Sequence, residues 1–255
     1  MKRIVLKVGS AVLTENNFIA IQRMRNLVDF IAELSKENEV ILVSSGAVSA
    51  GYSLLQLDRN IVENKQALAS LGQPLLMHSY KKKFDVHNIH CAQILVTSQN
   101  FKTEEQSSKI KKTIDSLLSS NIVVIVNEND TTSTDELVLG DNDQLSAYTA
   151  YATNADMLVI LSDIDAYYSH DPRTNPDAKV LKVVNEIPES ELCKDVTPNN
   201  CFATGGIVTK LKSADYLLKN SQSMFLASGF DLSDVKSFLL EGKHLGGTLF
   251  TKDEK

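Results

Sequence analysis

Cysteine is scarce in this 255-residue chain, and its cysteines lack the spacing that most cysteine chemistry requires. Cys91, Cys193 and Cys201 are odd in number, no two form a Cys-x-x-Cys motif, and Cys91 opens an apolar run. A disulfide framework or a zinc site is therefore not expected. Reduced cysteines, as in cytoplasmic proteins, are the simpler interpretation.

Long apolar runs and basic blocks are also absent. No run approaches the roughly 20 apolar residues that cross a bilayer, and the N-terminus has no signal-peptide core. The net charge is -6, and the densest basic cluster, Lys81-Lys82-Lys83, falls within a predicted helix, where a solvated face is the better explanation. We expect a soluble, cytoplasmic protein that binds neither nucleic acid nor membranes.

The common nucleotide-binding signatures are missing as well. The interval from Gly46 to Gly51 has the glycine spacing of a Walker A loop, but Tyr52 stands where the lysine belongs. There is no Gly-x-Gly-x-x-Gly fingerprint, and the His-Arg-Asp and Asp-Phe-Gly motifs of protein kinases are absent. A nucleotide site in this chain must therefore be built differently.

What the sequence does contain is a regular alternation of short apolar runs and amphipathic stretches, which is typical of βαβ units in an α/β fold with a mainly parallel sheet. The predicted strands span 4–8, 40–43, 92–96, 122–126 and 157–161. Crossover helices are predicted over 21–34 and, after the capping pattern of Thr103 and Gln106, as far as Leu118. Because no linker or repeat interrupts the series, we expect one domain over 1–255.

Carboxylates and amides crowd the stretch from residue 127 to 147, directly after an apolar strand. The carboxylates would repel one another unless a cation, a lysine or a ligand ammonium lay among them. A solvated acidic loop is the alternative, but two such clusters, at a strand end and ahead of an apolar helix, favour a site. The carboxylates are Glu128, Asp130, Asp135, Glu136, Asp141 and Asp143.

Two strands end in residues suited to an anion. Lys7 and Gly9 close the first strand, and Ser45 and Gly46 close the second. A lysine supplies a compact charge, and a glycine lets backbone N–H groups approach a phosphate closely. For Lys7 alone, a lysine whose ammonium reaches solvent beside Lys2 and Arg3 is about as good an explanation.

The second half of the chain repeats this pattern. Strand 157–161 is followed by Ser162 and Asp163, and then by a loop over 165–176 whose prolines predict a structured surface segment able to cover a base. His170 in that loop is more typical of a surface histidine than of a base or a metal ligand. Residues 180–184 suggest a short strand pair.

Paired glycines then open a helix at 204–210, with Lys210 one turn inside it, so that free N–H groups and an ammonium could meet the same phosphate. A surface helix that merely starts with glycine is the alternative.

Taken together, these motifs resemble the amino-acid kinase family nearly from end to end. They are Lys7-Val8-Gly9-Ser10, Ser44-Ser45-Gly46-Ala47, Asn127-Glu128-Asn129-Asp130, Gly140-Asp141-Asn142-Asp143, Asp171-Pro172-Arg173-Thr174-Asn175-Pro176 and Thr204-Gly205-Gly206-Ile207-Val208-Thr209-Lys210. The resemblance implies a three-layer αβα sandwich around a mainly parallel sheet. The Asn-Glu-Asn-Asp and Gly-Asp-Asn-Asp pair is similar to that of members that phosphorylate glutamate.

The resemblance also implies roles for individual residues. Lys7, Asp143 and Lys210 would be catalytic, with Asp143 orienting the two lysines, and no protein residue is assigned to a metal. The residues assigned to ATP are Lys7, Gly9, Ser162, Asp163, Thr204, Gly205, Gly206, Ile207, Val208, Thr209 and Lys210. Those assigned to the acceptor are Ser45, Gly46, Asp130 and Asn142. Ser162 departs mildly from the threonine of many relatives.

The implied activity is transfer of phosphate from ATP, with Mg²⁺, to the γ-carboxylate of L-glutamate, which begins proline synthesis. A carboxylate is already ionised at neutral pH, so no general base is needed. Lys7 and Lys210 would offset charge from two sides, while N–H groups near Gly9, Gly46 and Gly206 bind oxygens. The alternatives are a kinase for acetylglutamate, aspartate or UMP, and a non-catalytic sensor of proline or ATP.

The resemblance further implies a homo-oligomer, dimer or tetramer, inhibition by proline and a functional link to a reductase that consumes the product. The chain stops at Lys255, without the C-terminal PUA domain that many relatives carry.

Overall fold

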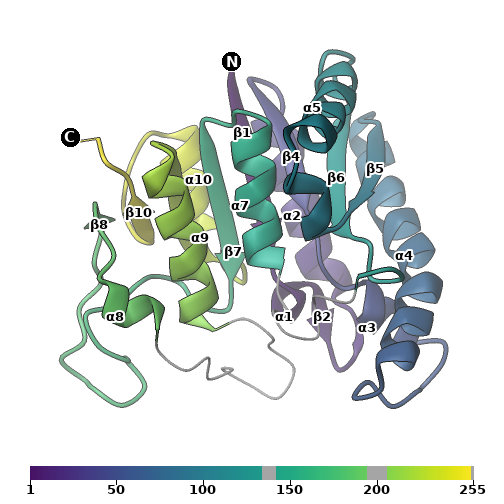
Figure 1. The fold of residues 1–255 in the computed structure, drawn as a ribbon, viewed down its shortest axis with the longest axis horizontal. Coiled ribbons are helices and arrows are strands. Elements are labelled where there is room, and N and C mark those ends of the chain that lie inside the picture. The colour runs from purple at the N-terminus through teal and green to yellow at the C-terminus, as the bar shows by residue number, and fades with distance from the viewer. Residues whose placement is uncertain (134–141, 194–205, 254–255) are drawn as a thin grey trace.

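The computed structural model describes residues 1–133, 142–193 and 206–253 (Figure 1). Within this part of the chain, eight strands form the main sheet in the order β5-β6-β4-β1-β7-β9-β10-β8. All neighbours are parallel except β9 and β10. The strands are β1 (Lys2–Val8), β4 (Asn38–Val43), β5 (Cys91–Val96), β6 (Val123–Glu128), β7 (Met157–Ser162), β8 (Val183–Val184), β9 (Ser223–Ser228) and β10 (Thr248–Phe250).

Helices cover both faces of this sheet, which gives the three-layer αβα architecture (Figure 1). They are α1 (Ser10–Leu13), α2 (Ile21–Leu34), α3 (Ala47–Tyr52), α4 (Val62–Phe84), α5 (Glu104–Leu118), α7 (Asn142–Ala152), α8 (Glu189–Leu192), α9 (Ile207–Lys219) and α10 (Ser233–Leu240), with 3₁₀ turns η1 (Asp85–His87) and η2 (Ser98–Phe101). A small hairpin of β2 (Thr14–Glu15) and β3 (Phe18–Ile19) follows α1.

The strands and helices predicted from the sequence are present. Helix α2 has the predicted bounds, and α5 begins after Thr103, whose side chain accepts a hydrogen bond from Gln106 N at 3.4 Å. Strand β6 runs past its predicted end to Glu128, because Asn127 and Glu128 still pair with Leu95 and Val96 of β5. The mainly parallel sheet is therefore confirmed.

Alternate residues of the buried strands serve two different cores. In β1, Leu6 packs with α2 and α4, whereas Val5 packs with α5, α7 and α9. Because side chains alternate along a strand, Lys7 falls on the face of Val5, toward α7 and α9. By the same alternation Asn127, two residues after Ile125, falls on the face of α4. The register of the sheet thus sends neighbouring polar side chains to opposite layers.

Helices α3 and α4 cross with almost no side chain between them. A Cβ on Gly72 would overlap Ala47 O and the Gly51 amide, and a Cβ on Gly51 would overlap Leu68 O. Glycine at both positions is therefore a requirement of backbone contact, and it fixes how closely α4 approaches the end of β4.

Two local predictions have different outcomes. Residues 180–184 do not pair with one another as predicted: Val183 and Val184 form β8 beside β10, and Val180 makes a single bridge with Tyr168. Val183 and Val184 pair instead with Leu249 and Phe250, at the edge of the main sheet. The Lys81-Lys82-Lys83 cluster does lie in a helix, with Lys81 and Lys82 exposed and Lys81 paired with Asp85.

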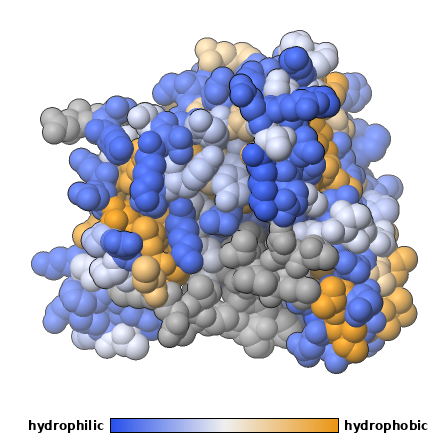
Figure 2. All heavy atoms as spheres, viewed as in Figure 1, coloured by the Kyte–Doolittle hydropathy of each residue, from blue (hydrophilic) through white to orange (hydrophobic). Residues whose placement is uncertain are grey.

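Hydrophilic residues dominate the surface on the side of α5, α7 and α9 (Figure 2). Among the described residues, no helix is both long and apolar enough to span a membrane.

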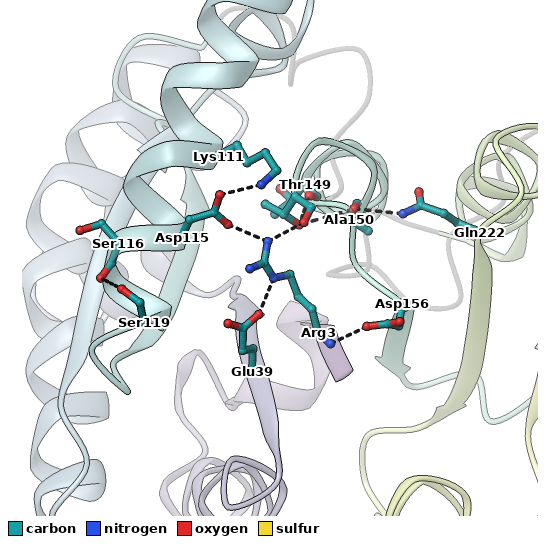
Figure 3. Close-up of polar contacts among 11 residues, drawn as sticks. Arg3, Glu39, Lys111, Asp115, Ser116, Ser119, Thr149, Ala150, Asp156 and Gln222 are labelled. Carbon is teal, nitrogen blue, oxygen red and sulfur yellow. Dashed lines mark hydrogen bonds and ion pairs between the residues drawn. The ribbon is translucent and has the colours of Figure 1, made fainter. Parts of the chain in front are cut away.

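An arginine ties together four elements at the amino ends of the strands (Figure 3). Arg3 of β1 donates to Glu39 Oε2 (2.8 Å), Asp115 Oδ1 (2.8 Å) and the Thr153 carbonyl oxygen (2.6 Å). Lys111 adds a second bond to Asp115, at 2.6 Å. This network connects β1 and β4 to α5 and to the end of α7. It therefore stabilises the edge of the sheet that lies opposite the carboxyl ends of the parallel strands.

Candidate functional site

The polar motifs of the sequence gather at the carboxyl ends of the parallel strands. Strand β1 is central, with β4 and then β6 on one side and β7 and then β9 on the other. Lys7 therefore stands between Ser45 and the 127–130 segment on one side and Ser162 and Asp163 on the other. In open α/β sheets, ligands bind at this edge, where the order of the strands reverses.

A buried trio of charges occupies the centre. Lys7 Nζ lies 2.5 Å from Asp143 Oδ1, and Lys210 Nζ lies 3.0 Å from Asp143 Oδ2. The side chains of both lysines are 2% exposed and that of Asp143 is 0% exposed. Each residue comes from a different element: the end of β1, the first turn of α7 and the first turn of α9.

This geometry settles two of the alternatives raised by the sequence. Lys7 does not reach toward solvent, because its ammonium is buried against Asp143. For Asp143, the positive partner that the acidic stretch requires is supplied by the protein. One carboxylate thus holds two buried ammonium groups, and ammonium groups at a strand end and a helix start can stabilise a phosphate.

Thr209 adds a further contact to the trio. Its hydroxyl lies 2.9 Å from both Asp143 Oδ2 and Gly206 O, so its proton has two possible acceptors. The sequence assigned Thr209 to the nucleotide, whereas its side chain contacts the carboxylate that holds the lysines. The sequence shows that Thr209 directly precedes Lys210, but it does not show the direction of the hydroxyl.

On the side of β4 and β6, amide groups form the lining. Asn142 Nδ2 donates to Ser44 O (2.6 Å) and Asn127 Oδ1 (2.9 Å) and lies 3.2 Å from Ser45 Oγ. Gly46, next along, has φ of 101°, a left-handed conformation that favours glycine and starts α3 directly after the strand. The structure thus brings Ser45, Gly46 and Asn142 together.

Other members of the acidic stretch have different surroundings. Glu128 is buried at the end of β6, and Asp130 is partly buried two residues later. Asp135, Glu136 and Asp141 lie outside the described residues, as do Thr204 and Gly205 of the nucleotide motif.

On the side of β7 and α9, Ser162 Oγ donates to Asp163 Oδ1 at 2.9 Å, and the Ser162 carbonyl oxygen accepts from Gly229 N at 2.7 Å. Gly206 caps α9, so the N–H groups of Ile207 and Val208 open that helix with no acceptor from its own turns. Val208 is buried and Ile207 partly buried, so both contribute backbone donors and packing.

Gly9 follows the last residue of β1 and lies close to the Lys7 ammonium. Its N–H donates to Leu161 O at 3.1 Å and belongs to the sheet. A Cβ there would lie 3.8 Å from Lys7 Nζ, so glycine keeps the space beside the ammonium open. The N–H groups of Ser10 and Ala11, at the start of α1, make no backbone hydrogen bond to a described residue.

Among the described residues, no group of three His, Cys, Asp or Glu side chains could hold a metal ion. Mg²⁺ commonly takes most of its oxygens from phosphates and water, so the residues present fit an ion carried by a nucleotide. His170 is exposed and contacts only its neighbour Ser169, at 3.2 Å, which agrees with a surface histidine.

Three contributors were missed by sequence reasoning: Asn127 as an internal hydrogen-bond partner, and Gln73 and Tyr80 of α4. Asn127 Nδ2 donates to Gln73 Oε1 at 2.8 Å, and the Tyr80 hydroxyl lies 2.9 Å from Ser44 Oγ. Burial raises the pKa of Tyr80, which keeps its hydroxyl protonated beside Ser44. Nothing in the sequence alone indicates that α4 brings these two side chains to the strand ends.

Comparisons with known proteins show the family of the chain. Residues 2–228 match the model of the amino acid kinase family. The chain is 50% identical to glutamate 5-kinase of Leishmania donovani, with 98% of this chain and 95% of that protein covered, and 51% identical to glutamate 5-kinase of Wolinella succinogenes, with 99% and 98% covered. Among solved structures it is similar to carbamate kinase from Giardia lamblia bound to AMP-PNP, with a TM-score of 0.68, 16% identity and 99% of each chain covered, a likeness of fold.

Proposed function

The chain belongs to the amino acid kinase family, and from this premise we infer that it transfers the γ-phosphoryl group of ATP to the γ-carboxylate of L-glutamate. The observation that carries the inference is the buried Lys7–Asp143–Lys210 trio, which lies between an amide-lined side and a glycine-started helix. The product is L-glutamyl 5-phosphate, the first intermediate of proline biosynthesis.

The reaction asks little of the protein beyond position and charge. The acceptor carboxylate is ionised at neutral pH, so a γ-carboxylate oxygen attacks the γ-phosphorus directly and the bond to the ADP oxygen breaks. Lys7, at the centre of the sheet, and Lys210, on the nucleotide side, stabilise the negative charge on the transferring group. Asp143 holds the two ammonium groups in place and limits their repulsion.

We propose that the nucleotide lies over the end of β7 and the start of α9. Ser162 and Asp163 contact it there, and the first N–H groups of α9, from Gly206 onward, bind its phosphate oxygens together with Thr204 and Gly205. Mg²⁺, bound to those phosphates, would supply further neutralisation of their charge. The N-terminal part of the chain then forms mainly the acceptor site and the C-terminal part mainly the ATP site, within one domain.

We propose that glutamate lies over the ends of β4 and β6. Ser45, Gly46, Asp130 and Asn142 would bind its α-amino and α-carboxylate groups and leave the γ-carboxylate near Lys7. Proline keeps an α-carboxylate and a cationic nitrogen but has no γ-carboxylate, so it would occupy this site and inhibit.

Three further proposals concern the setting of the enzyme. An acyl phosphate is labile in water, which supports coupling to a reductase that consumes it. Exposed Leu54, Leu55 and Ile61 near α3 support a homo-oligomer, dimer or tetramer, which light scattering would measure. The use of ATP as donor supports a cytoplasmic location.

The central experiment follows ADP release from MgATP with glutamate, acetylglutamate, aspartate or UMP as the acceptor. Glutamate alone should support turnover, and hydroxylamine should trap the product as γ-glutamyl hydroxamate. Robust turnover of UMP with none of glutamate would refute the assignment, and binding of ATP and proline without any turnover would indicate a sensor.

A pair of lysine variants tests the role of the trio. Lys210→Met keeps the bulk of a buried side chain but removes its ammonium, and the loss of one such preorganised group lowers kcat by about 10²–10³-fold. Lys219→Met, at the exposed end of the same helix, is the matched control and should retain normal kcat. Lys7→Met should resemble Lys210→Met. Near-normal kcat in either buried-lysine variant would contradict the mechanism.

The proline site is tested by Asp130→Ala. If Asp130 binds the cationic nitrogen shared by both ligands, the KM for glutamate and the inhibition constant for proline should rise together by about tenfold or more, while the KM for ATP stays unchanged. A rise in the glutamate KM alone would place the proline site elsewhere.

A further inference from the structure

Helix α4 reaches the acceptor side of the site through one side chain, Gln73. Its Oε1 accepts a hydrogen bond from Asn127 Nδ2 at 2.8 Å, although the two residues are 54 positions apart. The close crossing of α3 and α4 at Gly51 and Gly72 brings this part of α4 to the strand ends, since Gln73 directly follows Gly72. Gln73 has no assigned role in catalysis or binding.

The hydrogen bonds continue from Gln73 to Asn142. Because Asn127 Nδ2 is committed to Gln73, Asn127 Oδ1 faces the other way and accepts from Glu128 N and Asn142 Nδ2, both at 2.9 Å. Asn142 Nδ2 also donates to Ser44 O at 2.6 Å. The backbone sets the orientation of both asparagines, because Glu128 N requires an oxygen from Asn127 and Ser44 O requires an NH₂ group from Asn142, and Gln73 Oε1 holds the NH₂ group of Asn127 on its other side.

This order decides which atom Asn142 presents to a ligand. Its NH₂ group is occupied by Ser44 O and Asn127 Oδ1, and its Oδ1 accepts no hydrogen bond from any described residue. An oxygen attracts the α-ammonium of an amino acid, whereas an NH₂ group in the same place would repel it. The polarity of the acceptor site thus depends on Asn142 keeping its contacts with Ser44 O and with Asn127 Oδ1.

We propose that Gln73 is a positioning residue that holds the Asn127 amide in place, so that Asn142 keeps its oxygen toward the α-ammonium of the substrate. The proposal rests on the function proposed above, because it assigns glutamate to the ends of β4 and β6. Gln73 itself does not touch the substrate in this arrangement. It acts through Asn127, and the result is selectivity for an acid that carries a cationic α-nitrogen.

The decisive experiment compares glutamate with glutarate, which keeps both carboxylates and lacks the α-amino group. Gln73→Met retains the size of the side chain but removes the accepting oxygen. It should raise the KM for glutamate about 3–10-fold, as expected for one lost hydrogen bond, and leave the inhibition constant of glutarate and the KM for ATP within about twofold of wild type. Gln73→Glu keeps an accepting oxygen and should restore the KM for glutamate to within about threefold.

Gln66→Met is the matched control, because Gln66 lies two turns earlier on the same helix and its side chain makes no hydrogen bond to a described residue. Thermal melting of all variants checks that they fold. Equal losses for glutamate and glutarate in Gln73→Met would show a general packing role and overturn the proposal, as would a glutamate KM unchanged from wild type. A wild-type protein without glutamate turnover would overturn the proposed function, and this inference with it.

Discussion

The substitution Asp143→Asn separates the two roles that the central carboxylate plays. Asp143 is fully buried, and it holds both Lys7 and Lys210. Asparagine has nearly the same shape and can still accept a hydrogen bond from one ammonium. It cannot supply the charge, so the two buried ammonium groups lose the negative charge that they share.

The expected cost follows from this burial. Removing one partner from a buried ion pair typically costs about 3–5 kcal/mol, because the remaining charge is left uncompensated. For a protein of this size each kcal/mol corresponds to about 2–4 °C in Tm, so Asp143→Asn should melt roughly 6–20 °C below wild type. A bound anion should return part of this loss, and MgADP should therefore raise the Tm of the variant more than that of wild type. Turnover should fall by at least about 10²-fold, since the lysines lose their fixed positions.

Thermal melting with and without MgADP, together with steady-state kinetics, tests this reasoning. Asp85→Asn is the control, because Asp85 forms an exposed pair with Lys81 and exposed pairs contribute little to stability. If Asp143→Asn melted like Asp85→Asn, or if MgADP raised the Tm of variant and wild type equally, the carboxylate would not be compensating two buried ammonium groups.

Three other predictions follow from contacts outside this ion pair. Arg3→Met should lower the free energy of unfolding by about 1–3 kcal/mol, measured by urea denaturation, because it leaves part-buried acceptors unpaired, whereas Arg173→Met, in an exposed pair, should cost less than about 1 kcal/mol. Burial raises the pKa of Asp115, but hydrogen bonds from its lysine and arginine partners outweigh it and hold the pKa below 3.8. The ionised carboxylate therefore stabilises the fold fully above pH 3.8 and loses that effect as pH falls through the lowered pKa. The free energies of unfolding of wild type and Asp115→Asn, measured by denaturation, should differ at pH 7 and converge in acid. A difference that stayed constant with pH would refute this. Thr209→Val removes a hydroxyl beside Asp143 and should lower kcat about tenfold with little change in Tm, and an unchanged kcat would mean that the hydroxyl serves only Gly206 O.

Much of the fold could be predicted because its strands are buried on both faces and its crossover helices are amphipathic. Apolar runs of this kind mark β1, β4, β6 and β7, and the periodicity of α2 gave its bounds. Residues 180–184 were predicted to form strands, but the pairing of β8 with β10 was not, because β10 lies far along the chain and, like β9, was not among the predicted strands. A two-residue strand is specified by the sheet edge that receives it rather than by its own sequence.

The candidate site likewise contains residues that the sequence predicts and one that it does not. Lys7, Asp143 and Lys210 could be singled out because each belongs to a compact motif at a predicted strand end or helix start. Gln73 could not, because glutamine on a helix carries no signal of its own, and only the crossing at Gly72 brings it to Asn127.

The alternation of side chains along the strands explains why the two halves of the site are supported by helices on opposite faces of the sheet. Lys7 points toward α7 and α9, so the charged trio is held by the layer that also begins the nucleotide side. Asn127 and Ser44 face α4, so the amide chain is held by the opposite layer, through Gln73 and Tyr80. Asn142, at the first residue of α7, joins the two layers across the strand ends. Changes in the packing of α4 should therefore act first on recognition of the acceptor, and changes in α9 first on phosphate and the rate of transfer. One edge of the sheet can in this way bind two substrates close together, because the alternation of its residues gives each substrate its own supporting layer.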